Sequence, residues 1–227
     1  DHVDEVPVPG RALEAEVAAL AHVQRLGACV DLAGRTSLDQ ALALIASAKV
    51  FITQLEQPIP VAVHALKLAR AAGVTTILNP APAANLPDGM LVLCDYVTPN
   101  ESEAEALTGL PVTSVAEAEV AARALRALGA GAAIITLGEK GALYRDRTRS
   151  VHVPVISAGA VVETTGAGDA FYAGVLFGIH ENWSLERCLD LGNAAAATSL
   201  HSPTTSAGRP QTAKPRPWLP VSQSSSA

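Results

Sequence analysis

The chain has 227 residues, 49% of them hydrophobic, and a formal net charge of −6 at pH 7. This size and composition predict one large domain with a buried core. Neither nucleic acid nor a membrane is expected as a partner, because the sequence has no dense cluster of lysine and arginine and no run of about 18 apolar residues. The cysteines, Cys29, Cys94 and Cys188, are widely separated and odd in number, which indicates reduced thiols in a cytoplasmic protein. The scattered histidines show no metal-ligand spacing.

Short apolar runs alternate with helical patterns along the chain. The expected helices span residues 14–26, 61–72, 100–109, 115–128, 170–179 and 183–200. The expected strands span residues 49–55, 74–78, 95–98, 132–137, 142–145 and 151–156. This alternation predicts a mostly parallel sheet covered by helices on both faces, with the last two strands pairing antiparallel at one edge. In the helix at 61–72, the apolar spacing predicts a buried face made of Val61, Ala65, Leu66 and Ala69.

Several polar or glycine residues come directly after expected strands. They are Glu56, Asn79, Asn100, Gly138 and Asp169. Open α/β sheets bind ligands beyond the carboxyl ends of their strands. These residues are therefore expected to converge on one edge of the sheet.

Residues 164–171, with the sequence TTGAGDAF, place a carboxylate just inside a glycine-flanked helix start. The amides of Ala167, Gly168 and Asp169 would lack intrahelical partners there, and together with the helix dipole they can hold a phosphate. Asp169 is placed to accept a proton from a substrate hydroxyl that attacks phosphorus. The alternative is a glycine turn whose acidic residue only satisfies the dipole.

TTGAGDAF resembles the C-terminal signature of the ribokinase (PfkB) family of carbohydrate and nucleoside kinases. Four more stretches resemble that family in the expected order: FITQLE at 51–56, NPAPA at 79–83, TPNESEAE at 98–105 and ITLGEKG at 135–141. The similarity runs from about residue 47 to about residue 200. It implies a three-layer α/β/α, Rossmann-like fold and ATP-dependent phosphorylation of a sugar hydroxyl, with D-ribose as the leading acceptor.

By this resemblance, Asp169 is the catalytic base, and Gly166, Ala167 and Gly168 form the anion hole. The residues implied to bind the nucleotide are Asn100, Thr136, Leu137, Gly138, Glu139, Lys140, Gly141, Gly168 and Asn193. For Asn193, the alternative is a polar residue on an alanine-rich helix without contact to adenine.

The resemblance also implies two metal sites. Asn100 and Glu103 would organise Mg²⁺ through water, a mode that suits this ion; alternatively, the acidic residues at this helix start only stabilise its dipole. Glu163, Thr165 and Thr204 fall where the family binds a monovalent cation such as K⁺. Here Glu163 replaces the usual aspartate, and Thr204 stands where a glycine is usual.

Sugar recognition is where the sequence departs from the family. Of the sugar-binding residues, Asp1, Glu56 and Asp169 remain, and the alternative for Asp1 is a frayed terminus. A GGKGAN-type motif and most of the β-lid segment are missing. The kinase domain at 1–210 is therefore expected to be incomplete at its N-terminus, and the Pro/Ser-rich tail at 211–227 to be disordered. Because the family's lid commonly supplies a homodimer surface, a monomer or an unusual interface is expected.

Three functions remain open at this point. The first is an active, ATP-dependent sugar kinase. The second is a shortened relative that binds nucleotide with little or no kinase activity, because a kinase must hold its acceptor in line and exclude water. The third is a non-catalytic nucleotide-sensing or partner-binding module on the same scaffold.

Overall fold

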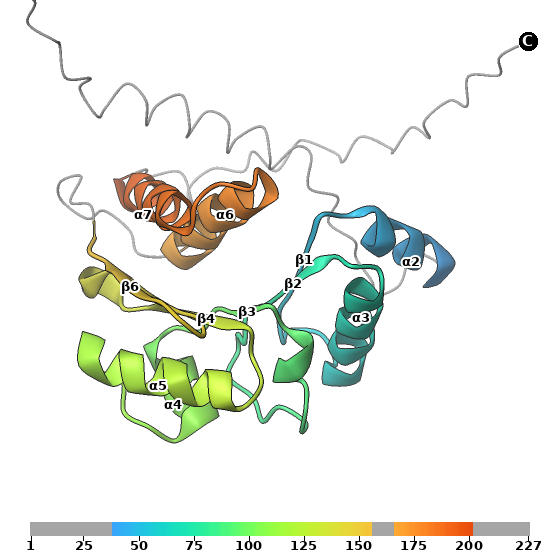
Figure 1. The fold of residues 1–227 in the computed structure, drawn as a ribbon, viewed down its shortest axis with the longest axis horizontal. Helices are drawn as coiled ribbons and strands as arrows, with labels where there is room; N and C mark the ends of the chain where they lie inside the picture. The colour runs from blue at the N-terminus through green and yellow to red at the C-terminus, as the bar shows by residue number, and fades with distance from the viewer. Residues whose placement is uncertain (1–37, 156–165, 202–227) are drawn as a thin grey trace, which may run out of the picture.

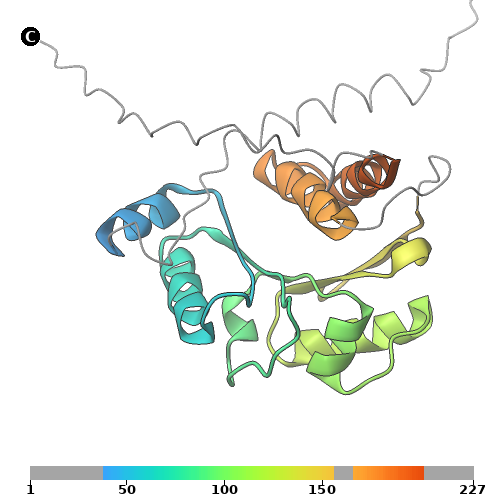
Figure 2. The ribbon, with the colours of Figure 1, turned by 180° about the vertical axis from the view of Figure 1, so that it is seen from behind.

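The computed structural model describes residues 38–155 and 166–201. Predictions that concern Asp1, Cys29, Glu163, Thr165, Thr204, the helix at 14–26 and the tail lie outside these residues. Within the described ranges, two helical layers enclose one sheet, as Figures 1 and 2 show from opposite sides. The expected three-layer α/β/α architecture is therefore confirmed.

In the described residues, the sheet contains six strands in the order β1-β2-β3-β4-β5-β6. Their bounds are Val50–Thr53 (β1), Thr75–Leu78 (β2), Tyr96–Val97 (β3), Ala132–Thr136 (β4), Ala142–Arg145 (β5) and Ser150–Val153 (β6). Strands β1 to β4 pair in parallel, and β4, β5 and β6 pair antiparallel. This confirms the mostly parallel sheet and its antiparallel edge. Strand β6 ends before Pro154, which has no N–H to donate to a ladder.

Helices of different parts of the chain cover the two faces of the sheet. One face is covered by α3 (Ile59–Ala71), α4 (Glu101–Thr108) and α5 (Val115–Ala127), and the other by α6 (Ala167–His180) and α7 (Leu185–His201) (Figure 1). Strand β4 shows why both faces are apolar. Its Ala133 and Ile135 pack in the core with α3 to α5, whereas Ala132 and Ile134 pack in the core with α6 and α7. A strand buried on both faces is typical of parallel sheets.

Two features of the α3 region differ from the sequence expectations. Val61 is 38% exposed, and Ala62 is buried in its place, because Ala62 stands three and four residues before Ala65 and Leu66 and so lies on their side of the helix. The predicted burial of Ala65, Leu66 and Ala69 is confirmed. The helix α2 (Leu38–Ser47) was not predicted. Its Ile45 is buried with Ala65 and Ala69 of α3, so this short helix is stabilised by tertiary packing.

Helices α6 and α7 cross at very short range through glycines. A Cβ atom added to Gly174 would lie 2.8 Å from the Cα of Gly192 and 2.8 Å from the carbonyl oxygen of Leu191. A Cβ atom at Gly178 would meet Cys188 at 2.6 Å. The two helices therefore form a closely packed pair whose separation is set by the absence of side chains at these positions.

Candidate active site

The start of α6 carries the predicted base. Gly166 caps the helix in the left-handed region at φ 84°, and Asp169 lies in the first turn. A Cβ atom added to Gly166 or Gly168 would have no neighbour within 4 Å, so there is open space beside the helix start. No acceptor for the amides of Ala167, Gly168 and Asp169 is found among the described residues, since the first intrahelical bond runs from the Ala170 amide to the Gly166 carbonyl at 2.9 Å. An anion can be held at such a helix start.

The acidic helix α4 begins with a complete capping box. The Oδ1 atom of Asn100 accepts from the Glu103 amide at 2.8 Å, and the Asn100 amide donates to Oε2 of Glu103 at 2.9 Å. The Ser102 hydroxyl also donates to Oδ1 of Asn100 at 2.9 Å. Glu103 is only 7% exposed. A buried carboxylate is thus fixed by its own helix start, beyond the end of β3.

The loop after β4 packs against this helix start. The Thr136 amide donates to the Pro99 carbonyl at 3.1 Å, and a Cβ atom at Gly138 would lie 3.6 Å from Oε1 of Glu101. Gly138, Glu139 and Lys140 are exposed in a short 3₁₀ turn, η2 (Gly138–Lys140). These three residues can therefore meet a ligand at this edge.

The two ends of this loop have structural roles. Leu137 directs its side chain into the core and is 1% exposed, so only its backbone can contribute to a ligand site. Gly141 lies at φ 89°, and an added Cβ atom there would fall 2.0 Å from the Val153 carbonyl. This position accepts only glycine.

Tyr172 connects these elements to α6, and the sequence analysis did not identify it. Its hydroxyl donates to the Thr98 carbonyl at 2.7 Å, and the Thr136 side chain lies close to the same group. The charges of Glu103 and Asp169 both act on this hydroxyl. The predicted base, the capped α4 start and the β4 exit are therefore brought together around one side chain.

At the same carboxyl edge of the sheet, β1 and β2 end next to each other. The Asn79 amide donates to the Thr53 carbonyl at 2.9 Å, and the Leu55 amide donates to the Ala81 carbonyl at 2.8 Å. Glu56 follows directly and is exposed. Glu56 therefore lies at the same sheet edge, beside the NPAPA loop, without a hydrogen bond to another described residue.

Asn193 takes a different position from the other predicted residues. It is 6% exposed on α7, and its Nδ2 donates to the Pro154 carbonyl at 2.9 Å. This hydrogen bond joins α7 to the chain just after β6. Whether the amide also meets a nucleotide stays a prediction.

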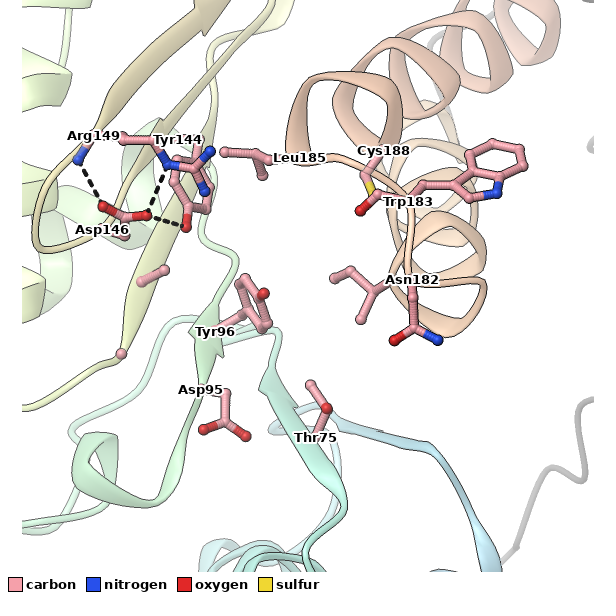
Figure 3. A pocket seen from close by; sticks show the side chains of 13 residues that line it. Thr75, Asp95, Tyr96, Tyr144, Asp146, Arg149, Asn182, Trp183, Leu185 and Cys188 are labelled. Atoms are coloured by element: carbon pink, nitrogen blue, oxygen red, sulfur yellow. Dashed lines mark hydrogen bonds and ion pairs between the residues drawn. The ribbon is translucent and has the colours of Figure 1, made fainter.

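The described cavities do not coincide with this edge. One of about 640 Å³ lies at the amino ends of the parallel strands and includes Tyr96, Tyr144 and Asp146 among its walls (Figure 3). Its charged side chains are already paired, since Asp146 accepts from Tyr144 and from Arg149. Although burial opposes it, hydrogen bonds from Arg149, Thr148 and Tyr144 hold the pKa of Asp146 well below its usual range. This cavity is part of the structural framework.

A second cavity, of about 740 Å³, lies along α3 and is mostly apolar. None of the predicted site residues lines it. Among residues 38–155 and 166–201, no group of three or more His, Cys, Asp or Glu side chains is placed to hold a metal ion.

Nothing in the described helices has the length and apolar character needed to cross a membrane. Cys94 and Cys188 are free and buried. Burial, with a contribution from Asp95, raises the pKa of the Cys94 thiol to about 12, which favours the protonated thiol over the thiolate.

An open α/β sheet with a glycine-capped helix start and an acidic, capped helix at one edge is the architecture of phosphate-binding α/β proteins. The chain belongs to the pfkB family of carbohydrate kinases, which it matches over residues 22–212. This confirms the resemblance and extends it beyond the region expected from the motifs alone.

Individual relatives agree with this assignment. Ribokinase from Staphylococcus aureus (strain COL) is 36% identical over 157 residues, which cover 69% of this chain and 51% of the relative. Deoxyribokinase from Salmonella typhi is 40% identical over 135 residues, covering 59% of this chain and 44% of the relative. The solved structure of Arabidopsis thaliana ribokinase complexed with ribose and ATP matches with a TM-score of 0.70 at 30% identity, covering 73% of this chain and 54% of that one. The chain thus spans about half the length of the relatives it matches.

Proposed function

We propose that this protein phosphorylates a sugar hydroxyl with ATP and that its acceptor is D-ribose or a close relative such as 2-deoxy-D-ribose. The observation that carries the proposal is the hydrogen bond of 2.7 Å from the Tyr172 hydroxyl to the Thr98 carbonyl. It joins α6, which carries Asp169 in its first turn, to the end of β3 that leads into the capped start of α4. The names of the relatives, ribokinase and deoxyribokinase, support the choice of acceptor.

In the proposed reaction, Asp169 accepts the proton of the sugar hydroxyl while that oxygen attacks the γ-phosphorus of ATP. The new O–P bond forms as the bond from the γ-phosphorus to the β–γ bridging oxygen breaks, and ADP leaves with the electron pair. The amides of Ala167 and Gly168 stabilise the negative charge on the transferring phosphoryl group. Gly138, Glu139 and Lys140 line the nucleotide side.

Metal ions would act in support of these residues. Mg²⁺, held near Glu103 and Asn100 through water, would neutralise phosphate charge. The carboxylate of Glu103 suits this role, because it is buried and fixed by the capping box and only its Oε2 atom is used there. For K⁺, the predicted ligands Glu163, Thr165 and Thr204 lie outside the described residues, and their role stays a prediction.

The test compares the parent chain with Asp169→Asn. We expect Asp169→Asn to lower turnover by about 10² to 10⁴-fold, the usual contribution of a general base, and to leave ATP affinity nearly unchanged. A coupled assay for ADP release with D-ribose and 2-deoxy-D-ribose measures turnover, and calorimetry with ATP and Mg²⁺ measures affinity. Asp88→Asn, which changes an exposed carboxylate in the loop between β2 and η1 (Leu91–Leu93), is the matched control.

The outcomes separate the candidate functions. Full activity in Asp169→Asn would refute the assignment of the base. A parent chain that binds ATP but releases no ADP with either sugar would favour the shortened, nucleotide-binding relative. A parent chain with no ATP affinity at millimolar concentration would reject every function proposed for this edge.

A further inference from the structure

A buried tyrosine hydroxyl joins the start of α6 to the exit of β3 in the candidate site. Tyr172 follows Asp169 by three residues on α6, so the two side chains lie on the same side of the helix. Tyr172 is 8% exposed, and its hydroxyl donates to the Thr98 carbonyl at 2.7 Å. Burial, reinforced by the charges of Glu103 and Asp169 and opposed by the nearby side chains of Thr136 and Thr98, raises the pKa of Tyr172 above its usual range. The hydroxyl therefore remains a donor.

The other described contacts of α6 are with α7, with β1 and with the apolar core beside the sheet, and none of them is a hydrogen bond to a strand exit. Gly174 and Gly178 hold the middle and the end of the helix close to α7, and Gly192 of α7 packs against Phe171 near the start. Phe171 and Val175 pack in the core formed with β4 to β6. Apolar packing is not directional, so it allows the helix start to shift or rotate slightly. A short hydrogen bond to the backbone at the end of β3 is directional and resists such a shift.

We propose that Tyr172 is a positioning residue that holds the start of α6, and with it the Asp169 carboxylate, in register with the nucleotide-side elements at the exits of β3 and β4. It acts through Asp169 and the Thr98 carbonyl, and does not touch the reacting atoms. The catalytic effect of Tyr172 rests on the proposed kinase function. Its effect on the geometry of the α6 start is independent of that function.

Tyr172→Phe tests the inference, with Tyr144→Phe as a matched control. Tyr144 is also buried, at 4% exposed, and its hydroxyl donates to Asp146 at 2.9 Å at the opposite edge of the sheet. Each variant removes one buried, hydrogen-bonded hydroxyl and keeps the ring. Any effect that follows from lost stability alone should therefore appear in both variants.

Two readouts are needed, and one of them does not require turnover. Amide hydrogen exchange of Ala170, whose amide forms the first hydrogen bond within α6, reports how firmly the helix start is held. We expect it to accelerate in Tyr172→Phe and to remain at the parent value in Tyr144→Phe. In the ADP-release assay, we expect kcat to fall by about 10- to 100-fold in Tyr172→Phe alone, with the KM for ATP unchanged, because a small misplacement of a reacting group costs rate more than binding.

Each outcome has one reading. Unchanged exchange at Ala170 in Tyr172→Phe would overturn the inference, whatever the activity. If exchange accelerates in Tyr172→Phe while the parent chain has no activity, the positioning role is supported and the kinase function is rejected. Accelerated exchange with an unchanged kcat would overturn the catalytic part of the inference, and equal effects in both tyrosine variants would reduce the role of Tyr172 to stability.

Discussion

The crossing of α6 and α7 makes a sharp prediction for Gly174→Ala. The added Cβ atom would lie 2.8 Å from three backbone atoms of α7: the Cα and nitrogen of Gly192 and the carbonyl oxygen of Leu191. Favourable separations between carbon atoms are about 3.5–4.0 Å. Backbone atoms cannot rotate away as a flexible side chain can, so the two helices must move apart.

The size of the effect follows from two opposing contributions. Overpacking of a core costs about 1–3 kcal/mol, and replacing glycine by alanine inside a helix returns up to about 1 kcal/mol. We therefore expect a net loss of about 1–2 kcal/mol in the free energy of unfolding, which lowers Tm by about 2–8 °C in a domain of this size.

Thermal and urea unfolding followed by far-UV circular dichroism measure this loss. Gly168→Ala is the control for stability alone, because it lies on the same helix and an added Cβ atom there has no neighbour within 4 Å. We expect the control to unfold at or slightly above the temperature of the parent. A Gly174→Ala variant as stable as Gly168→Ala would show that the two helix backbones are not packed at this distance.

Two further predictions concern carboxylates. Glu103→Gln keeps an acceptor for the Asn100 amide but removes the buried charge, so we expect little change in stability. Calorimetry should show a loss of magnesium-dependent ATP affinity of about 10- to 100-fold, the size usual for a group that acts through a metal-bound water. The control Glu105→Gln, at an exposed position, should have no effect, and equal affinities in both variants would contradict the role of Glu103. Because the pKa of Asp146 is lowered in the folded state, its stabilisation should be present above pH about 4 and lost as the pH falls further. Asp146→Asn should therefore be less stable than the parent in urea at pH 7, with a difference that shrinks in acid, and a difference independent of pH would contradict this.

The sequence predicted the sheet well because its signals are local. A strand buried on both faces, such as β4, is a continuous apolar run, and glycine or a capping side chain marks where helices begin and end. Ser114 accepts from the Glu117 amide at 3.2 Å as an N-cap, and Gly109 ends α4 in the left-handed region at φ 69°. Such features depend on a few neighbouring residues, so they can be interpreted without the tertiary structure.

The features that the sequence did not predict correctly share a different cause. Val61 and Ala62 are both apolar enough for a helix core, and Ala62 is the buried one because it lies in one core with distant residues such as Leu78 and Leu125. Tyr172 stands in an apolar helix and looks like one more core residue in sequence. Its importance comes from the Thr98 carbonyl, 74 residues away in the chain. Contacts between distant segments of this kind carry no local pattern, so the sequence alone could not place this hydroxyl.

In the described part of the chain, the residues proposed to bind the nucleotide are held more firmly than those proposed to bind the sugar. The proposed nucleotide side includes Glu103 and Thr136, which are fixed by the capping box of α4 and by the hydrogen bond of the Thr136 amide to the Pro99 carbonyl. The proposed acceptor side includes Asp169 and Glu56, which are both exposed, and Glu56 has no hydrogen bond to another described residue. A fixed nucleotide site does not by itself position the sugar, and phosphoryl transfer is fast only when both reactants are held in line. Nucleotide affinity and sugar phosphorylation therefore report on different halves of this edge, and neither measurement can stand in for the other.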